Sequence, residues 1–425
     1  MIDASTPLEI ALSIAMGRMT IIGTMEVLPN SLLAAHVVRN RRPPKELASA
    51  QPGQKHQNSY TPCKTRLDRL PSSNPLPTMT ALPAKLSTGA TSPAMLGAYS
   101  VVLAFERTAQ SDPKLRRLID ARILGYLLRE LPTHEARLAV ALELNSCNGY
   151  DDLISIAKLY YGHFLRLFKK NEGPIPTPGT HSSRPSFETY KEMMRATIVE
   201  APQDRHEAKV NALARDGYRC VVTGYHDRAS VNRSTDLPAQ VLAEKGRTVE
   251  TGCAYIFAEF TNANISGSDA GSTKCEYGAS LWTVLRRFGY RNIPDELSGN
   301  KIHRPQNVMT LRTDVHSAFD TLSLWFEPVE DRPNVYEIKT ARESDMLPDF
   351  KKTVEFTTPD ANILPVPSRE YLALHAACAR VAHLSGAGKY MDKIFRDMED
   401  IQVLSEDGVS AELLEHALLP LSGRV

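Results

Sequence analysis

Residues 302–320, with the sequence IHRPQNVMTLRTDVHSAFD, decide the fold that this chain is expected to adopt. Residues 307–311 predict a β-strand, and a helix is expected to begin just after it. His316 and Asp320 are four residues apart, so they share one face of that helix, one turn from each other. An imidazole and a carboxylate placed in this way suit two ligands of a single metal ion.

Other stretches accompany this segment in a fixed order along the chain. They are YRCVVTGYHD at 218–227, CAYIFAEF at 253–260, LWTVLRRFG at 281–289 and LWFEP at 324–328. Together they resemble the HNH endonuclease family, most closely its fungal branch, and the resemblance extends over about residues 195–420. It implies a ββα-metal module, in which two hairpin strands and a helix hold one divalent cation for the hydrolysis of phosphodiesters.

The resemblance also implies roles for individual residues. Asn307 matches the central Asn of the family, expected to tie the loop between strand and helix. His316 matches the last His, a metal ligand, with Asp320 as its companion. Tyr255 stands where the family has its general-base His, and Ala258 replaces a proline of the same motif. A tyrosine with a pKa of about 10 is protonated at neutral pH, so activity is expected to be weakened or lost.

The residues themselves leave alternatives open. His316 could be an ordinary helix histidine, and Asp320 could be a surface acid. His303 could replace the missing base, although a surface histidine is the commoner case, and His226 is expected to face solvent. Cys220 and Cys253 are expected to be core thiols, because no second pair completes a zinc site. The metal could be Mg²⁺, Mn²⁺, Ni²⁺ or Zn²⁺.

A local excess of basic residues suggests where nucleic acid binds. Between residues 274 and 312 there are seven basic residues and three acidic ones. A solvated helix face would have the same composition, so both interpretations stay open. The residues expected to contact phosphates are Arg286, Arg287, Arg291, Lys301 and Arg304.

The composition excludes several classes of protein. The 425 residues are 42% hydrophobic and 23% charged, which is ordinary for a globular protein. The net charge of +1 excludes a histone-like protein, and the six cysteines without a CxxC pair fit an intracellular compartment, nucleus or cytoplasm. No apolar run approaches the length of a membrane span.

The expected fold class is α+β: a small HNH-like module flanked by helical regions, with disordered linkers. The expected parts are a largely disordered region at 1–95, a helical region at 96–170, a linker at 171–186, the HNH-like domain at 187–345 and a helical C-terminal region at 346–425 packed on it. Metal-dependent cleavage of nucleic acid, most simply DNA, is the leading function. The alternatives are an inactive nucleic-acid-binding module and an interaction scaffold without metal.

Overall fold

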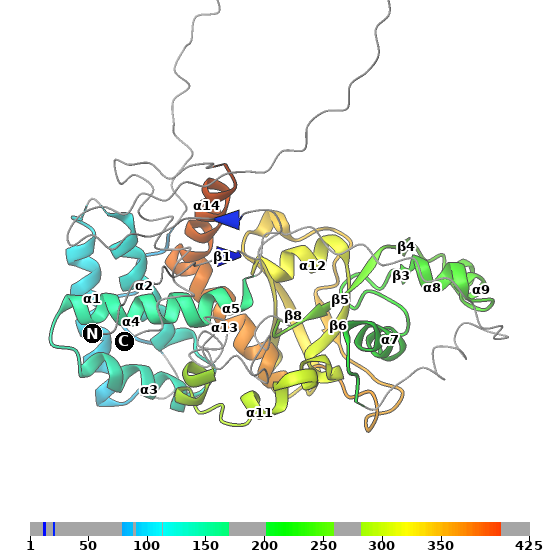
Figure 1. Cartoon of the computed structure of the whole chain (residues 1–425), viewed down its shortest axis with the longest axis horizontal. Helices are drawn as coiled ribbons and strands as arrows, with labels where there is room; N and C mark the ends of the chain where they lie inside the picture. Colours follow the sequence, from blue (N-terminus) through cyan, green and yellow to red (C-terminus); the bar gives the residue numbers. More distant parts are fainter. Residues whose placement is uncertain are drawn as a thin grey trace, which may run out of the picture. The chain divides into compact units, whose positions relative to one another are not determined.

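The computed structural model describes residues 12–13, 20–21, 79–87, 91–112, 114–169, 201–258 and 282–400 (Figure 1). The chain divides into two compact units, and one of them contains residues Met79–Phe395. In the other unit, β1 (Leu12–Ser13) pairs antiparallel with β2 (Thr20–Ile21). Most of the region 1–78 and the whole of the expected linker 171–186 lie outside the described residues.

The first half of the larger unit is helical. Pro93 occupies the first turn of α1, and the Ser92 hydroxyl accepts the amide of Met95 as an N-cap. A π-helical turn, Tyr161–Leu165, follows α4 directly. The helices are α1 (Pro93–Ala109), α2 (Leu115–Glu130), α3 (His134–Asn145), α4 (Tyr150–Tyr160) and α5 (Arg166–Phe168).

Ordered structure reaches further toward the N-terminus than the boundary expected at residue 95. Leu82 and Leu86 are buried in the same core as α1 and α2. The Leu82 amide donates to the buried carboxylate of Glu106, which also pairs with Arg122 at 2.7 Å. Prolines are compatible with this segment, because an extended chain that packs against helices does not need backbone donors at every residue.

The second half combines short strands and short helices. The helices are α7 (Arg205–Arg215), α8 (Arg228–Arg233), α9 (Leu237–Ala243), a helix at 282–287, α11 (Ile293–Leu297) and α12 (Thr313–Asp320). Two 3₁₀ turns, Gly299–His303 and Pro305–Asn307, precede β6. The strands are β3 (His226–Asp227), β4 (Thr248–Val249), β5 (Thr251–Tyr255), β6 (Val308–Arg312), β7 (Leu324–Pro328), β8 (Val335–Thr340) and β9 (Thr353–Glu355).

The predicted strand, strand and helix are present. β5 and β6 pair antiparallel, from Thr251 opposite Arg312 to Tyr255 opposite Val308. α12 follows β6 without a break and contacts both strands. β7, β8 and β9 form a separate antiparallel sheet, and β3 pairs parallel with β4. The described chain is therefore a mixture of helices and small sheets, as the α+β prediction requires.

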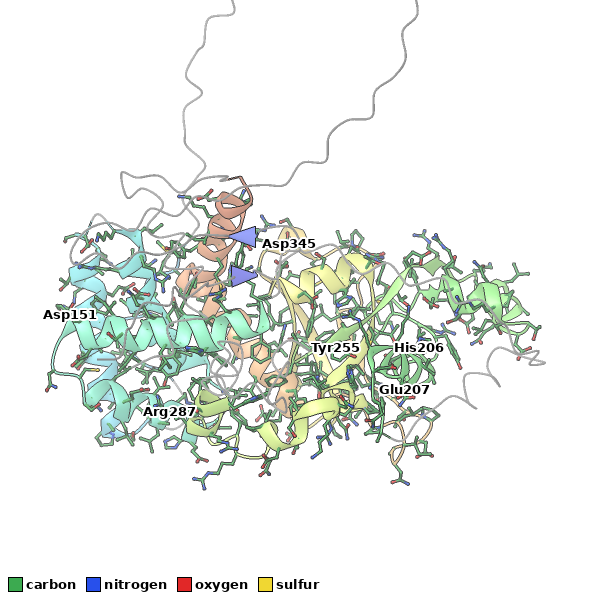
Figure 2. The ribbon with its side chains drawn as sticks, in the orientation of Figure 1. Asp151, His206, Glu207, Tyr255, Arg287 and Asp345 are labelled. Atoms are coloured by element: carbon green, nitrogen blue, oxygen red, sulfur yellow. The ribbon has the colours of Figure 1, made fainter. Side chains whose placement is uncertain are left out.

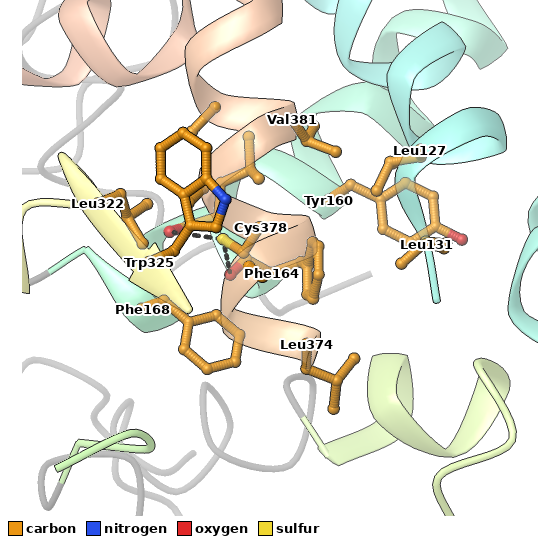
Figure 3. Close-up of a cluster of buried hydrophobic side chains, with 14 of the residues drawn as sticks. Leu127, Leu131, Tyr160, Phe164, Phe168, Leu322, Trp325, Leu374, Cys378 and Val381 are labelled. Carbon is orange, nitrogen blue, oxygen red and sulfur yellow. Dashed lines mark hydrogen bonds between the residues drawn. The ribbon is translucent and has the colours of Figure 1, made fainter. Parts of the chain in front are cut away.

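One hydrophobic core joins the helical half to the rest of this unit. α13 (Arg369–Ser385) contacts both α2 and β7, and α14 (Ala387–Asp400) follows it. Figure 3 shows Cys378 of α13 beside Phe164, Phe168 and Trp325, with its thiol directed at the carbonyls of residues 164 and 165. The two halves are thus packed as one body. None of the described helices has the length and apolarity to cross a bilayer.

Candidate active site

Tyr255 is buried and hydrogen-bonded to a histidine. Its hydroxyl lies 2.8 Å from Nδ1 of His303, and the two side chains are 2% and 5% exposed. The Arg205 guanidinium, on α7, lies 5.5 Å from the centre of the Tyr255 ring. Figure 2 labels Tyr255 together with His206 and Glu207 of α7. His303 is therefore not the surface histidine that the sequence favoured. It is the partner of the residue expected to stand in place of the family's base.

Asn307 ties together the two segments that carry this pair. Its Oδ1 accepts the amide of Phe257 at 2.8 Å, and its Nδ2 donates to the carbonyls of Phe257 and Ile302 at 3.0 and 2.9 Å. The side chain is fully buried. It therefore fixes the ends of β5 and of the 3₁₀ turn before β6, whereas the sequence placed this tie between β6 and α12. The geometry differs because Asn307 precedes β6 and lies far from the start of the helix.

His316 and Asp320 form the second pair, on α12. Nε2 of His316 lies 3.4 Å from Oδ2 of Asp320, and their side chains are 14% and 21% exposed. A carboxylate at the C-terminal end of a helix meets the negative end of the helix dipole, so a cation beside it is favourable. Both side chains retain the solvent access that a small ion needs.

Gly252 provides the space for His316. A Cβ atom at Gly252 would lie 2.8 Å from Nδ1 of His316, closer than real contacts allow. The imidazole thus packs directly on the backbone of β5. Glycine within a strand commonly marks such a close approach, and this signal was available in the sequence.

The two pairs occupy different places on β5. Gly252, beneath His316, and Tyr255 are three residues apart, about 10 Å along the strand. The sequence predicted that Tyr255, Asn307, His316 and Asp320 would share one concave site. The contacts join Tyr255 to His303 in a buried pair and His316 to Asp320 in a partly exposed pair, and the shared site stays a prediction.

Adding a methyl group at Gly252 should displace His316. We expect Gly252→Ala to lower the free energy of unfolding by about 1–3 kcal/mol, the usual cost of overpacking a close contact. Urea unfolding measures this change. The control is Gly149→Ala, since a Cβ there meets nothing within 4 Å. If the two substitutions changed the free energy of unfolding equally, the His316 side chain would be able to move aside without loss of stability.

The basic residues expected to contact phosphates are partly neutralised. Arg287 pairs with Glu143 of α3 at 3.0 Å, and Arg304 pairs with Glu296 at 3.3 Å. The other three expected contacts remain exposed: Arg286, Arg291 and Lys301. Arg286 also lies 3.9 Å from a carboxylate oxygen of Asp295, and Nζ of Lys301 donates to the Asp295 carbonyl at 3.2 Å, so four of the five have partners within the fold. The exposed side chains still present positive charge to a polyanion.

Other predicted groups fall in the core. Cys220 and Cys253 are buried, as expected of core thiols, and burial raises the pKa of the Cys253 thiol to about 12. His226 is fully buried, with Nε2 3.3 Å from Glu244, so the prediction that it faces solvent was wrong. Within the described ranges, no group of three or more His, Cys, Asp or Glu side chains could hold a metal ion.

The family comparison fits this arrangement. Residues 220–327 match the family model described as HNH endonuclease. This segment belongs to the HNH endonuclease family. The HNH segment, residues 220–327, contains β5, β6, α12 and all the predicted site residues, so the family prediction is confirmed. No curated protein and no solved structure gives a significant match to the chain.

Proposed function

We propose that this protein binds nucleic acid through its HNH segment and hydrolyses phosphodiesters with a divalent metal ion, at a rate reduced by the loss of the family's base. The HNH segment supports nucleic acid as the substrate class. The observation that carries the reduced rate is the state of Tyr255: its hydroxyl is bonded to His303 and 2% of the residue is exposed.

A buried, hydrogen-bonded phenol cannot activate water at an exposed phosphate. A general base must reach the proton that it removes, directly or through one water molecule. Neither Tyr255 nor His303 offers a solvent-facing atom of that kind in the described structure, since both are at least 95% covered. The same burial argues against Tyr255 as a nucleophile that attacks phosphorus. Cleavage would therefore depend on water that no positioned general base activates, and it would be slower than in a site that has one.

His316 and Asp320 would hold the metal ion. They supply one imidazole and one carboxylate, which is sufficient for a site completed by water and by the phosphate oxygens of the substrate. When bound, the ion would neutralise charge on the phosphate and on the leaving oxygen. Gly252 keeps the imidazole against β5, and the helix turn keeps the carboxylate beside it.

Metal-dependent nicking tests the proposal. The full chain is incubated with supercoiled DNA or labelled RNA and with Mg²⁺, Mn²⁺, Ni²⁺ or Zn²⁺ in turn. We expect slow cleavage with at least one metal ion, abolished by a chelator and reduced at least tenfold by His316→Ala. Cleavage that persists in His316→Ala, or with chelator present, would exclude this pair as the metal site.

An inactive nucleic-acid-binding module is the second candidate, and the burial of Tyr255 and His303 favours it. This alternative predicts salt-dependent binding without cleavage under any metal. Binding should then fall when the exposed cations Arg286 and Arg291 are replaced by alanine. A chain that binds no nucleic acid would favour the interaction scaffold.

A further inference from the structure

The carbonyls on either side of Asp320 are held by side chains from outside the HNH segment. Nζ of Lys169, which follows α5, donates to the carbonyl of Thr321 at 3.0 Å. Nε2 of His375, on α13, lies 3.2 Å from the carbonyl of Phe319. Since a carbonyl only accepts, this Nε2 must carry the proton. Two distant helical segments therefore meet at the turn that carries Asp320.

Both donors are buried and fixed by further contacts. The Lys169 side chain is 3% exposed and pairs with Asp392 at 2.8 Å. The His375 ring is stacked on Phe319, with centroids 3.8 Å apart and planes 9° from parallel. A lysine and a histidine N–H at the end of a helix also satisfy its last carbonyls and oppose the dipole.

The backbone of this turn is strained. The amide of Leu322 donates to the carbonyl of Phe319 at 3.1 Å, and that of Ser323 to the carbonyl of Ala318 at 2.8 Å. This pattern ends a helix with a left-handed residue, and glycine is usual at that position. Here the residue is Leu322, with φ of 63°. A bulky side chain is unfavourable in this region of backbone conformation, so the surroundings must hold the turn in place.

We propose that Lys169 and His375 are positioning residues for Asp320. They hold the strained turn, so that the carboxylate stays beside His316 as the second metal ligand. The assignment rests on the proposed function, because it concerns the same metal pair. It also gives the flanking helical regions a role: the HNH segment alone lacks both donors.

Mn²⁺ affinity of the full chain, measured by titration with electron paramagnetic resonance, tests the assignment. We expect Lys169→Met and His375→Phe each to weaken Mn²⁺ binding by about 10–100-fold, as is typical when groups that orient metal ligands are removed. His375→Gln keeps an N–H donor and should retain most of the affinity. The direction of the change in Mn²⁺ affinity is informative for Lys169→Met. Removing a nearby positive charge would by itself tighten cation binding, so weaker binding points to a loss of positioning.

The control is Tyr160→Phe, which removes a buried hydroxyl bonded to Glu143, a contact in the helical half of the unit. Thermal unfolding without metal reports the folded fraction of each variant. Unchanged Mn²⁺ affinity in Lys169→Met and His375→Phe would overturn the assignment, as would an equal loss in Tyr160→Phe. If the unmodified protein binds no Mn²⁺, or binds it equally well after His316→Ala, the proposed metal site itself is wrong and the assignment falls with it.

Discussion

Tyr255→His is expected to increase cleavage of nucleic acid by about 10²–10⁴-fold, the usual contribution of a positioned general base. An imidazole with a pKa near 6.5 is largely unprotonated at neutral pH, whereas a phenol is not. Histidine is also shorter than tyrosine, so it cannot make the same contact with His303 and leaves room for water. The measurement is the initial rate of nicking with the most effective metal ion.

Two controls separate a restored base from other effects. Tyr255→Phe also breaks the bond to His303 but adds no base, so its rate should stay near that of the unmodified protein. Adding His316→Ala to Tyr255→His should remove the gain. If Tyr255→His binds metal and cuts no faster than the unmodified chain, the site has lost more than its base. The inactive module then becomes the better description.

Arg215→Met is expected to lower the free energy of unfolding by about 3–5 kcal/mol, because it leaves a buried carboxylate without its partner. The Arg215 side chain is fully buried, at the end of α7, and pairs with Asp216 at 2.8 Å. It also donates to the carbonyls of Pro305 and Val308 at 2.7 and 2.8 Å. Asp216 in turn accepts the amide of Thr310 at 2.8 Å. This pair therefore attaches α7 to β6.

A double-mutant cycle distinguishes the buried charge from lost packing. Asp216→Asn can still accept the Thr310 amide but carries no charge, so combining it with Arg215→Met should recover at least 1 kcal/mol relative to Arg215→Met alone. Urea unfolding measures all four proteins. Strict additivity of the two substitutions would show that the charge of Asp216 does not contribute to the loss.

The strand, strand and helix around the site could be predicted from the sequence because the signals are local. Residues 307–311 predict a strand with a helix directly after it, and the structure places β6 at Val308–Arg312 and α12 at Thr313–Asp320. The spacing of His316 and Asp320 fixes their proximity through the helix repeat alone. The ordered motifs were sufficient for the family, which the match over residues 220–327 confirms.

The burial of the histidines could not be predicted, because it depends on segments far apart in the chain. His303 is covered through Tyr255, 48 residues away, and His226 lies under the turn at Gly246. No local pattern distinguishes such a histidine from one on the surface. The same holds for the pairing of Arg287 with Glu143, which are 144 residues apart. From composition alone, Arg287 would be expected to contact phosphate.

Three properties could be read from the order of the amino acids alone: the family of the HNH segment, the mixed fold class and the helical pairing of His316 with Asp320. These follow from short-range periodicity and from motifs that remain in order along the chain. Long-range packing places His303 against the hydroxyl of Tyr255, and it brings Lys169 and His375 to the strained turn beside Asp320. Such contacts form when one core buries helices from both sides of the HNH segment, and the free energy of that burial depends on the whole unit rather than on any one stretch of sequence.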